Sequence, residues 1–475
     1  MFSGKEQIIL GLVVSIYFMF LFALSLYMKR KTKTYEDYNV AGRSVSFFPL
    51  MLTFVGTGVG GATLLGYMEN GYTLGMREQW IHITMFFVVI ILALFLLKKI
   101  RKLGEEHHLV TVGDYTALRY GEKARIPTVI SFLFSYCAMT GMQFVAIASI
   151  LNLTIGLNLT VGIFIGWGLL TAKTYLGGLK AVIWQDVIQG TILTIGVILL
   201  FFIIIKDSSG WNTIVANAQV ENQEAMLDIF NITPTEILIY LLTLSFFQFI
   251  RQDVWQRIWA AKSLKTAQTS YWISMIIAVS IGAIVVAIGV FSRFELKLGN
   301  IDPSLVYYHV IGNVFPFSIV IVMIIALLAA VISTADSFFI AGSSSIVNDI
   351  IRPKIQDASQ TKMLFYSRIS VLIVSLIALL LALMIPGLVN LMVTGTAMAV
   401  SGLLAPVIFG MFWDKPTNIA GVTAMWLGLG SSVIWTLLGH PFNLHPIMIG
   451  LPLSIITLLI MTFATNKLNQ NYLHT

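Results

Sequence analysis

Residues 52–66 read LTFVGTGVGGATLLG, an apolar stretch crowded by Gly56, Gly58, Gly60, Gly61 and Gly66. Each glycine inside a helix costs about 1 kcal/mol relative to alanine. Close packing is one explanation, because small residues let membrane helices approach one another. The other is an interrupted helix, whose freed carbonyls line a cavity and coordinate a cation. Thr57 and Thr63 add polar groups to the same stretch and favour the interrupted helix.

A second apolar stretch also carries polar groups where hydrocarbon should continue. Residues 327–345 read LLAAVISTADSFFIAGSSS. At 3.6 residues per turn, one stripe of a helix holds Ala330, Ser333, Thr334, Ser337, Ala341, Ser344 and Asn348. Asp336 lies on the flank of this stripe, and an ionisable residue at membrane depth marks a functional site. Hydroxyl, carbonyl and carboxylate oxygens suit hard cations, so the stripe predicts a sodium site.

Another carboxylate lies within a predicted span. Residues 177–189 read GGLKAVIWQDVIQ and place Asp186 about one turn into apolar sequence. A salt bridge to Lys180 is one interpretation. The other is that Asp186 faces the interior of the bundle as a cation ligand or proton carrier.

The composition excludes a soluble protein. The chain has 475 residues, of which 57% are hydrophobic and 11% are charged, whereas soluble domains average about 25% charged residues. A single cysteine, Cys137, excludes an intrachain disulfide and argues against a cysteine-ligated metal. About 20 apolar residues make one crossing, and by this rule the chain has about 13 transmembrane helices, with no sizeable soluble domain.

The basic residues predict how the chain is oriented. They follow alternate spans, in KRKTK (29–33), in KKIRK (98–102), at Arg251, Arg257, Lys262 and Lys265, and at Arg352, Lys354 and Lys362. Basic loops stay in the cytoplasm, which predicts an outside N-terminus and a cytoplasmic C-terminus. An odd number of spans likewise requires the two ends to lie on opposite sides. The net charge of +7 is therefore a topology signal and does not indicate nucleic acid binding.

Four motifs together resemble the sodium:solute symporter family, which includes sodium/proline, sodium/pantothenate, sodium/sialic acid and sodium/glucose transporters. They are YEDYNVAGRS (35–44), GGLKAVIWQDVIQG (177–190), RQDVWQRIWAAKS (251–263) and LLAAVISTADSFFIAGSSSIVNDI (327–350). The resemblance implies the all-α LeuT-type fold of two inverted five-helix repeats with discontinuous core helices. Residues 1–475 then form one transporter domain, divided into an extra helix and basic loop (1–45), two repeats (46–206 and 234–412) and extra helices (413–475).

The resemblance also implies cation ligands. The common sodium site would use the carbonyls of Gly56, Val59 and Ala330 with the hydroxyls of Ser333 and Thr334. A second sodium site, found in some members, would use Asp186, Ser333, Asp336 and Ser337. The chain departs from the proline transporters, which carry aspartate and tryptophan at the positions of Gly58 and Ala62. Proline is therefore in doubt as the substrate.

The substrate cavity is predicted from polar and aromatic residues near the midplane. They are Thr57, Gly61, Thr63, Gln79, Trp80, His82, Phe247 and Gln248, with Tyr136, Gln143, Thr394 and Thr396. The fourth span carries no midplane arginine like the one that binds the carboxylate in sialic acid transporters. A neutral or zwitterionic solute, such as a sugar, an amino acid or a vitamin-like molecule, is favoured over an organic anion.

These observations predict a sodium-coupled symporter that imports a small polar organic solute by alternating access. The alternative is a proton-coupled transporter on the same fold, with Asp186 and Asp336 exchanging protons. No nucleophile–base pair or HExxH-like spacing indicates an enzyme. We expect Na⁺ as the coupling ion, no organic cofactor, no obligatory protein partner, and a multi-pass location in a bacterial plasma (inner) membrane.

Overall fold

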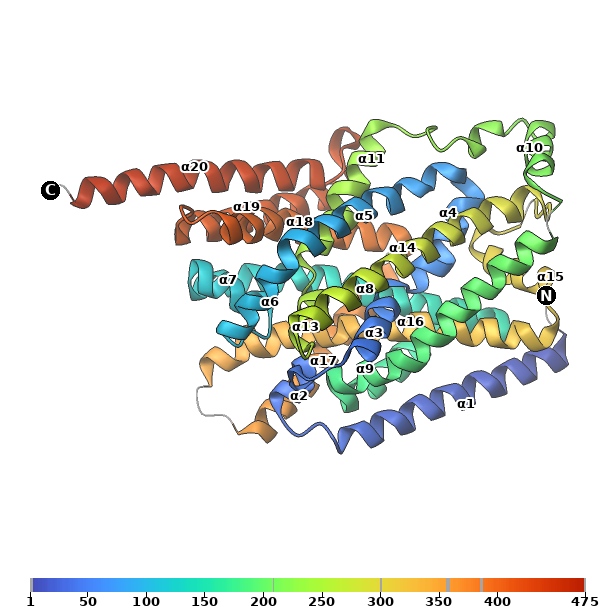
Figure 1. Ribbon diagram of the computed structural model, residues 1–475, viewed down its shortest axis with the longest axis horizontal. Helices are drawn as coiled ribbons and strands as arrows, with labels where there is room; N and C mark the ends of the chain where they lie inside the picture. Colours follow the sequence, from blue (N-terminus) through green and yellow to red (C-terminus); the bar gives the residue numbers. More distant parts are fainter. Residues whose placement is uncertain (1–2, 208, 300, 356–358, 385–387, 474–475) are drawn as a thin grey trace.

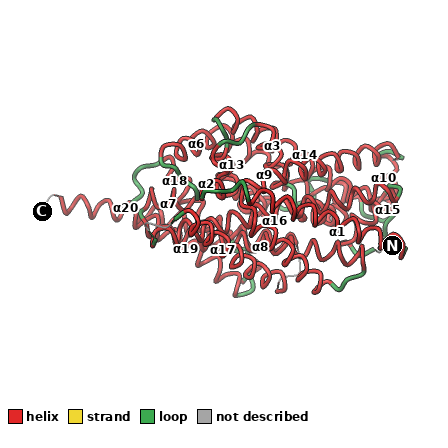
Figure 2. Tube along the Cα trace, turned by 90° about the horizontal axis from the view of Figure 1, so that it is seen from below, coloured by secondary structure: helices red, strands yellow, loops and turns green. Residues whose placement is uncertain are grey.

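The computed structural model describes residues 3–207, 209–299, 301–355, 359–384 and 388–473. Long helices run roughly along one axis, and the two chain ends lie at opposite ends of that axis (Figure 1). Short loops connect the helices (Figure 2). Two chain ends on opposite sides agree with an odd number of crossings.

The first half of the chain is built from nine α-helices and three longer helical turns. The α-helices are α1 (Gly4–Lys29), α2 (Tyr35–Val40), α3 (Phe47–Gly58), α4 (Tyr67–Leu74), α5 (Trp80–Ile91), α6 (Leu97–Glu106), α7 (Val112–Tyr120), α8 (Arg125–Ile155) and α9 (Leu159–Asp207). The longer turns are η2 (Ala62–Gly66), η3 (Gly75–Gln79) and η4 (Leu92–Leu96). Two short turns are η1 (Ala41–Arg43) and η5 (Glu122–Ala124).

The second half continues in the same way. Its α-helices are α10 (Trp211–Val220), α11 (Pro234–Tyr240), α12 (Phe246–Ile250), α13 (Gln252–Ala260), α14 (Leu264–Phe294), α15 (Val306–Val314), α16 (Phe317–Ser345), α17 (Gln360–Met384), α18 (Leu388–Phe412), α19 (Asn418–Leu437) and α20 (Ile447–Leu473). Its turns are η6 (Glu224–Leu227), η7 (Leu241–Ser245), η8 (Pro303–Leu305), η9 (Ile346–Ile351), η10 (Arg352–Lys354) and η11 (Pro441–Asn443).

Eleven helical stretches among the described residues are long and apolar enough to cross a membrane. The difference from the predicted 13 arises because two of these stretches each contain a turn between two predicted spans. The stretch Ala62–Glu106 turns at Gly75, where φ is 83°, and Leu159–Lys206 turns at Gly178, where φ is 69°. Glycine adopts these positive φ values without a steric penalty. The short apolar helix α3 precedes Ala62–Glu106 and forms the first part of the second predicted crossing.

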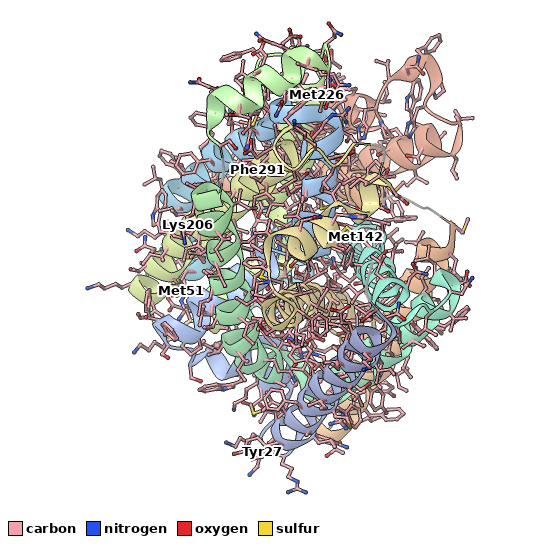
Figure 3. The ribbon with its side chains drawn as sticks, turned by 90° about the vertical axis from the view of Figure 1, so that its right-hand side faces the viewer. Tyr27, Met51, Met142, Lys206, Met226 and Phe291 are labelled. Atoms are coloured by element: carbon pink, nitrogen blue, oxygen red, sulfur yellow. The ribbon has the colours of Figure 1, made fainter. Side chains whose placement is uncertain are left out.

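The centre of the bundle is α16. Every residue from Ala326 to Ser345 is buried, and α16 packs against α3, α8, α9 and α17. A helix that is buried on all sides, with its polar groups facing neighbouring helices, lies in the core of the bundle. At the periphery, α1 exposes Ile8, Leu12 and Met19. Figure 3, seen along the bundle, places Tyr27 of this helix at the edge. An exposed apolar surface of this kind suits contact with lipid.

Two membrane helices are interrupted. The first breaks between α3 and η2, where Val59 takes extended backbone angles of φ −118° and ψ 97°. The second breaks between α12 and α13, where Arg251 has φ −56° and ψ 110°. The glycine-rich stretch thus forms an interrupted helix, as one of its two interpretations predicted. The second break was not predicted from the sequence.

Candidate functional site

The first break lies directly against α16. The Thr334 hydroxyl donates a hydrogen bond to the Gly56 carbonyl at 3.0 Å, across the interface between the two helices. A Cβ atom added to Gly60 would come within 2.7 Å of the Thr334 Oγ1, and one added to Gly56 would collide with Ser333 Oγ. Glycine at both positions therefore allows this close approach. Val59 is buried at the break, and Ala330 is buried one turn before Ser333 and Thr334.

A buried carboxylate adjoins this contact. Asp186 of α9 accepts hydrogen bonds from the Ser333 hydroxyl at 2.5 Å and from the Thr53 hydroxyl. Arg257 of α13 lies 3.5 Å from the same carboxylate and donates to Ser337 Oγ at 2.5 Å. The fold therefore brings together three of the four residues predicted for the second sodium site, namely Asp186, Ser333 and Ser337. Thr53 and Arg257 complete the cluster and were not anticipated.

Asp336, the fourth of those residues, faces a different neighbour. Its carboxylate forms a buried ion pair with Lys173 of α9 and accepts a hydrogen bond from Thr174 Oγ1 at 2.6 Å. The Lys173 ammonium also donates to Gln185 Oε1 at 2.6 Å. Lys173 was not singled out, although a lysine within an apolar stretch is a visible signal in the sequence.

The candidate substrate cavity lies beside the first break. Five of the first eight residues predicted for the cavity line it, namely Thr57, Thr63, His82, Phe247 and Gln248. Gln143 and Thr396 line it as well, whereas Thr394 does not. Thr334 also contributes to the wall. One residue of the predicted sodium site therefore borders the space in which a solute would bind.

The other residues predicted for the cavity have different partners. The Gln79 side chain donates to the Ala283 carbonyl at 2.9 Å, and the Trp80 indole donates to the Ile229 carbonyl at 2.9 Å. The Gly61 amide donates to Gln143 Oε1 at 3.1 Å, behind the cavity wall formed by its neighbours. Tyr136 donates to Asp253 Oδ1 at 3.1 Å. These residues support the site without lining it.

The cavity wall holds two notable nitrogen-bearing side chains. Arg251 lies at the second break, where Asp253 accepts two hydrogen bonds from its guanidinium at 2.6 and 3.1 Å, and Gln248 accepts one at 3.2 Å. His82 is buried against Tyr67, and neither of its ring nitrogens has a hydrogen-bond partner among the described residues. The charge of Arg251 is balanced, whereas His82 presents free polar atoms.

One expectation about basic residues is wrong, and one of the two interpretations of Asp186 is excluded. Arg251 and Arg257 were assigned to a cytoplasmic loop, but both are buried around α13 because intramembrane carboxylates offer them partners. Lys180 bonds to Asp37 of α2 at 3.0 Å and not to Asp186. Burial alone would raise the pKa of Asp37, but the Lys180 ammonium and the amides of Lys33 and Thr34 hold it below its usual value.

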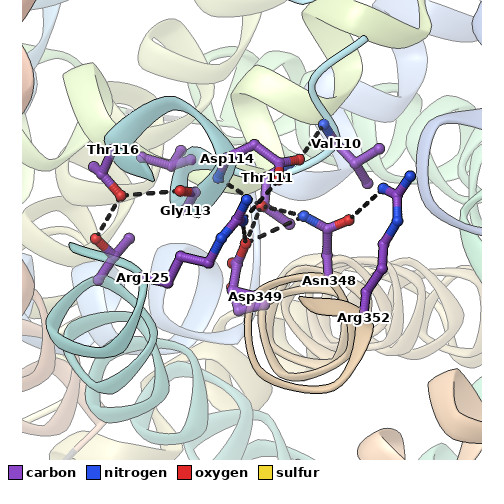
Figure 4. A network of polar contacts seen from close by, with 12 residues as sticks. Val110, Thr111, Gly113, Asp114, Thr116, Arg125, Asn348, Asp349 and Arg352 are labelled. Atoms are coloured by element: carbon purple, nitrogen blue, oxygen red, sulfur yellow. Dashed lines mark hydrogen bonds and ion pairs between the residues drawn. The ribbon is translucent and has the colours of Figure 1, made fainter. Parts of the chain in front are cut away.

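A polar network ties helices together at the end of the bundle predicted to face the cytoplasm (Figure 4). Arg125 of α8 bridges Asp114 of α7 and Asp349 of η9, each at 2.8 Å. Asp349 also accepts a hydrogen bond from Thr111 Oγ1 at 2.7 Å. Asn348 links Thr111 at 2.9 Å to Arg352 at 3.1 Å. These contacts hold η9, the continuation of α16, against α7 and α8.

Comparison with known proteins identifies relatives along almost the whole chain. The model of the sodium:solute symporter family matches residues 38–428. The sodium/pantothenate symporter of Haemophilus influenzae is 27% identical over 98% of this chain and 96% of its own length. The high-affinity proline transporter of Bacillus subtilis is 24% identical over 93% of this chain and 95% of its own.

A solved structure resembles the fold. It is a substrate-bound, outward-open Na⁺-coupled sialic acid symporter, with a TM-score of 0.79, 19% identity, and coverage of 96% of this chain and 97% of that one. The likeness confirms the predicted all-α membrane fold of the LeuT type. The family match confirms the resemblance that the four motifs predicted.

Proposed function

Because the chain belongs to the sodium:solute symporter family, we propose that it imports a small polar organic solute together with sodium, by alternating access. The family match and the relatives support directly that the chain is a multi-pass membrane transporter for sodium-coupled symport of a small solute, and not an enzyme. The outside N-terminus and the bacterial plasma membrane remain predictions.

The sodium site we propose consists of the Gly56, Val59 and Ala330 carbonyls with the Ser333 and Thr334 hydroxyls. The observation that carries the proposal is the contact between Thr334 and the Gly56 carbonyl at the break in α3. Carbonyl and hydroxyl oxygens are the ligands that hard cations accept, and an interrupted membrane helix supplies such carbonyls. Bound sodium would join α3 to α16 and so favour one arrangement of the two repeats.

The cavity supports a neutral or zwitterionic solute. Arg251, a fixed charge in its wall, is neutralised by Asp253, so the pair offers polar groups without a net attraction for anions. Thr57, Thr63 and Gln248 supply hydroxyl and amide groups, and His82 supplies two unpaired nitrogens. Of the substrates named for the relatives, proline is a zwitterion and agrees with this proposal, whereas pantothenate is an organic anion.

Thr334 belongs to the proposed sodium site and also lines the cavity, which gives a physical basis for coupling between sodium and solute. Sodium that fixes Thr334 and α3 also shapes the cavity, and the coupling is reciprocal, so the solute must tighten sodium by the same factor. Opening toward the cytoplasm would require η9 to leave α7 and α8. We infer that the network of Arg125, Asp114 and Asp349 breaks at that step.

The test is uptake of pooled labelled sugars, amino acids and vitamins into proteoliposomes, with an inward gradient of sodium or of choline. We expect uptake only with sodium. Replacing Ser333→Ala and Thr334→Ala together should lower it by more than about tenfold, the effect of 1.4 kcal/mol. Ser343→Ala is the matched control, because this buried hydroxyl of α16 bonds only to the Ile340 carbonyl of its own helix.

The competing proton-coupled function predicts a different result. It requires Asp186 and Asp336 to exchange protons, yet each has a buried cation of the protein within 4 Å. Uptake that is driven by a pH gradient and is indifferent to sodium would overturn the sodium proposal. Uptake that needs sodium at constant pH, and fails in the double variant, would exclude the proton-coupled function.

A further inference from the structure

The buried ion pair between Lys173 and Asp336 has no role in the function proposed above. Both side chains are almost fully buried. Asp336 projects from α16 toward α9, where one carboxylate oxygen pairs with the Lys173 ammonium and the other accepts from Thr174 Oγ1 at 2.6 Å. The carboxylate therefore has a positive partner and a hydroxyl donor without any ion from outside.

The ammonium is held in place from a second side. Lys173 donates to Gln185 Oε1 at 2.6 Å, and the Gln185 amide in turn donates to Ser25 Oγ at 2.8 Å and to the Leu21 carbonyl at 3.3 Å. Gln185 is the residue just before Asp186 on α9, while Ser25 and Leu21 belong to α1. Two membrane helices besides α16 thus fix the position of this charge.

Asp186, the other carboxylate near Ser333, is also provided with a protein cation. Arg257 lies 3.5 Å from Asp186 and donates to Ser337 Oγ at 2.5 Å. Each acidic residue predicted for a second sodium site therefore has a basic partner from another element. A sodium ion added at Asp336 would lie beside the Lys173 ammonium, and like charges repel strongly where water is excluded.

We propose that the Lys173 ammonium is a built-in cation that takes the place of a second sodium ion at Asp336, so that each transport cycle carries one sodium. This inference rests on the proposed sodium-coupled function. Lys173 is tethered and cannot be released, so it contributes no coupling energy. It supplies the positive charge that the α16 carboxylate needs in every state of the cycle.

The experiment is equilibrium binding of ²²Na⁺ alone to the purified full-length protein, which requires no knowledge of the solute. We expect one sodium ion per chain in the wild type. Lys173→Met removes the ammonium and leaves Asp336 without a cation, so binding should rise to two ions per chain. Lys173→Arg keeps the charge and should bind one, and the double variant Lys173→Met/Asp336→Asn should return to one.

Lys180→Met is the matched control, because Lys180 also lies on α9 but bonds to Asp37 of α2. It should still bind one ion. Two ions bound by the wild type would overturn the inference even if Lys173→Met did not fold, and one ion bound by folded Lys173→Met would also overturn it. No sodium bound by the wild type would instead contradict the sodium-coupled function itself, so the two failures are distinguishable.

Discussion

The two interrupted helices reach similar geometry with different residues. Around Val59 the first break is surrounded by glycines, and its neighbour across the interface is the pair of hydroxyls Ser333 and Thr334. The second break has no glycine. It falls at Arg251, directly before Gln252 and Asp253 of α13. The side chains of Arg251 and Asp253 bond to each other, and that of Gln252 bonds to α16. Both breaks border the cavity, at Gly58 and Gly60 and at Arg251, but only at the second are charged side chains of the protein paired with each other.

The backbone groups at the second break have partners from the chain itself. The Trp255 indole donates to the Phe249 carbonyl at 3.0 Å, and the Asp253 amide donates to the Tyr136 hydroxyl at 3.2 Å. The Gln252 side chain, one residue after the break, also donates to the Ala341 carbonyl of α16 at 2.6 Å. Backbone polar groups at membrane depth need partners. The glycine break obtains them in part from α16 and, in our proposal, from sodium, which makes it the coupling element.

The largest expected loss of stability follows a substitution at the second break. Asp253→Asn should destabilise the protein by about 3–5 kcal/mol, because it leaves the Arg251 charge buried and uncompensated. Thermal unfolding in detergent measures the loss. The double variant Arg251→Gln/Asp253→Asn should recover most of it. A single variant as stable as the wild type would show that this break does not depend on the ion pair.

Removing sodium should affect only the first break. At a sodium concentration 100 times the dissociation constant, bound ion stabilises the folded state by about 2.7 kcal/mol. Replacing sodium with choline should therefore lower the unfolding temperature of the wild type and leave that of Thr334→Ala almost unchanged. Equal shifts in both proteins would mean that sodium binds elsewhere or acts as a general salt.

Gly56→Ala tests the close approach of α3 to α16. The added methyl would collide with Ser333 Oγ, and overpacking of this kind costs about 1–3 kcal/mol. When this cost destabilises the sodium-bound protein relative to the sodium-free protein, sodium affinity drops by about 10- to 100-fold. Titration of uptake against sodium concentration measures this loss of affinity. Gly168→Ala, a helical glycine with open space around its Cβ position, should behave as the wild type.

The smallest expected effect on sodium affinity comes from a substitution at the second break. Trp255→Phe removes the indole donor from the Phe249 carbonyl, which costs about 0.5–1.5 kcal/mol. The smaller ring adds the cost of a cavity at this fully buried position, and sodium affinity should be unchanged. Thermal unfolding and sodium titration of uptake give the two values. A loss of sodium affinity comparable with that of Gly56→Ala would show that the two breaks are coupled more tightly than their separate contacts indicate.

The glycine break could be predicted from sequence because its cause is local. Glycines weaken the helix where they occur, and the hydroxyl stripe on 327–345 follows from helical periodicity alone. The break at Arg251 has no such local cause, since its stabilising partners Tyr136 and Ala341 are distant in sequence. A polar break is recognisable only after the fold has assembled.

The pairing of buried charges was hard to predict for the same reason. The rule that basic residues stay in the cytoplasm placed Arg257 in a loop, yet a nearby carboxylate on another helix gives it a buried position. The salt bridge between Lys180 and Asp186, one of the two interpretations, would have joined residues close in sequence, but Lys180 bonds to Asp37. Lys173 was visible inside an apolar run, but its partner Asp336 lies 163 residues away.

The central claim is that sodium binds where the break in α3 meets α16. A structure of the full-length protein determined in sodium, and again in choline, tests it most directly. We predict a sodium-dependent density peak enclosed by the Gly56, Val59 and Ala330 carbonyls and the Ser333 and Thr334 hydroxyls. No peak at this position in sodium, or an identical peak in choline, would contradict the account.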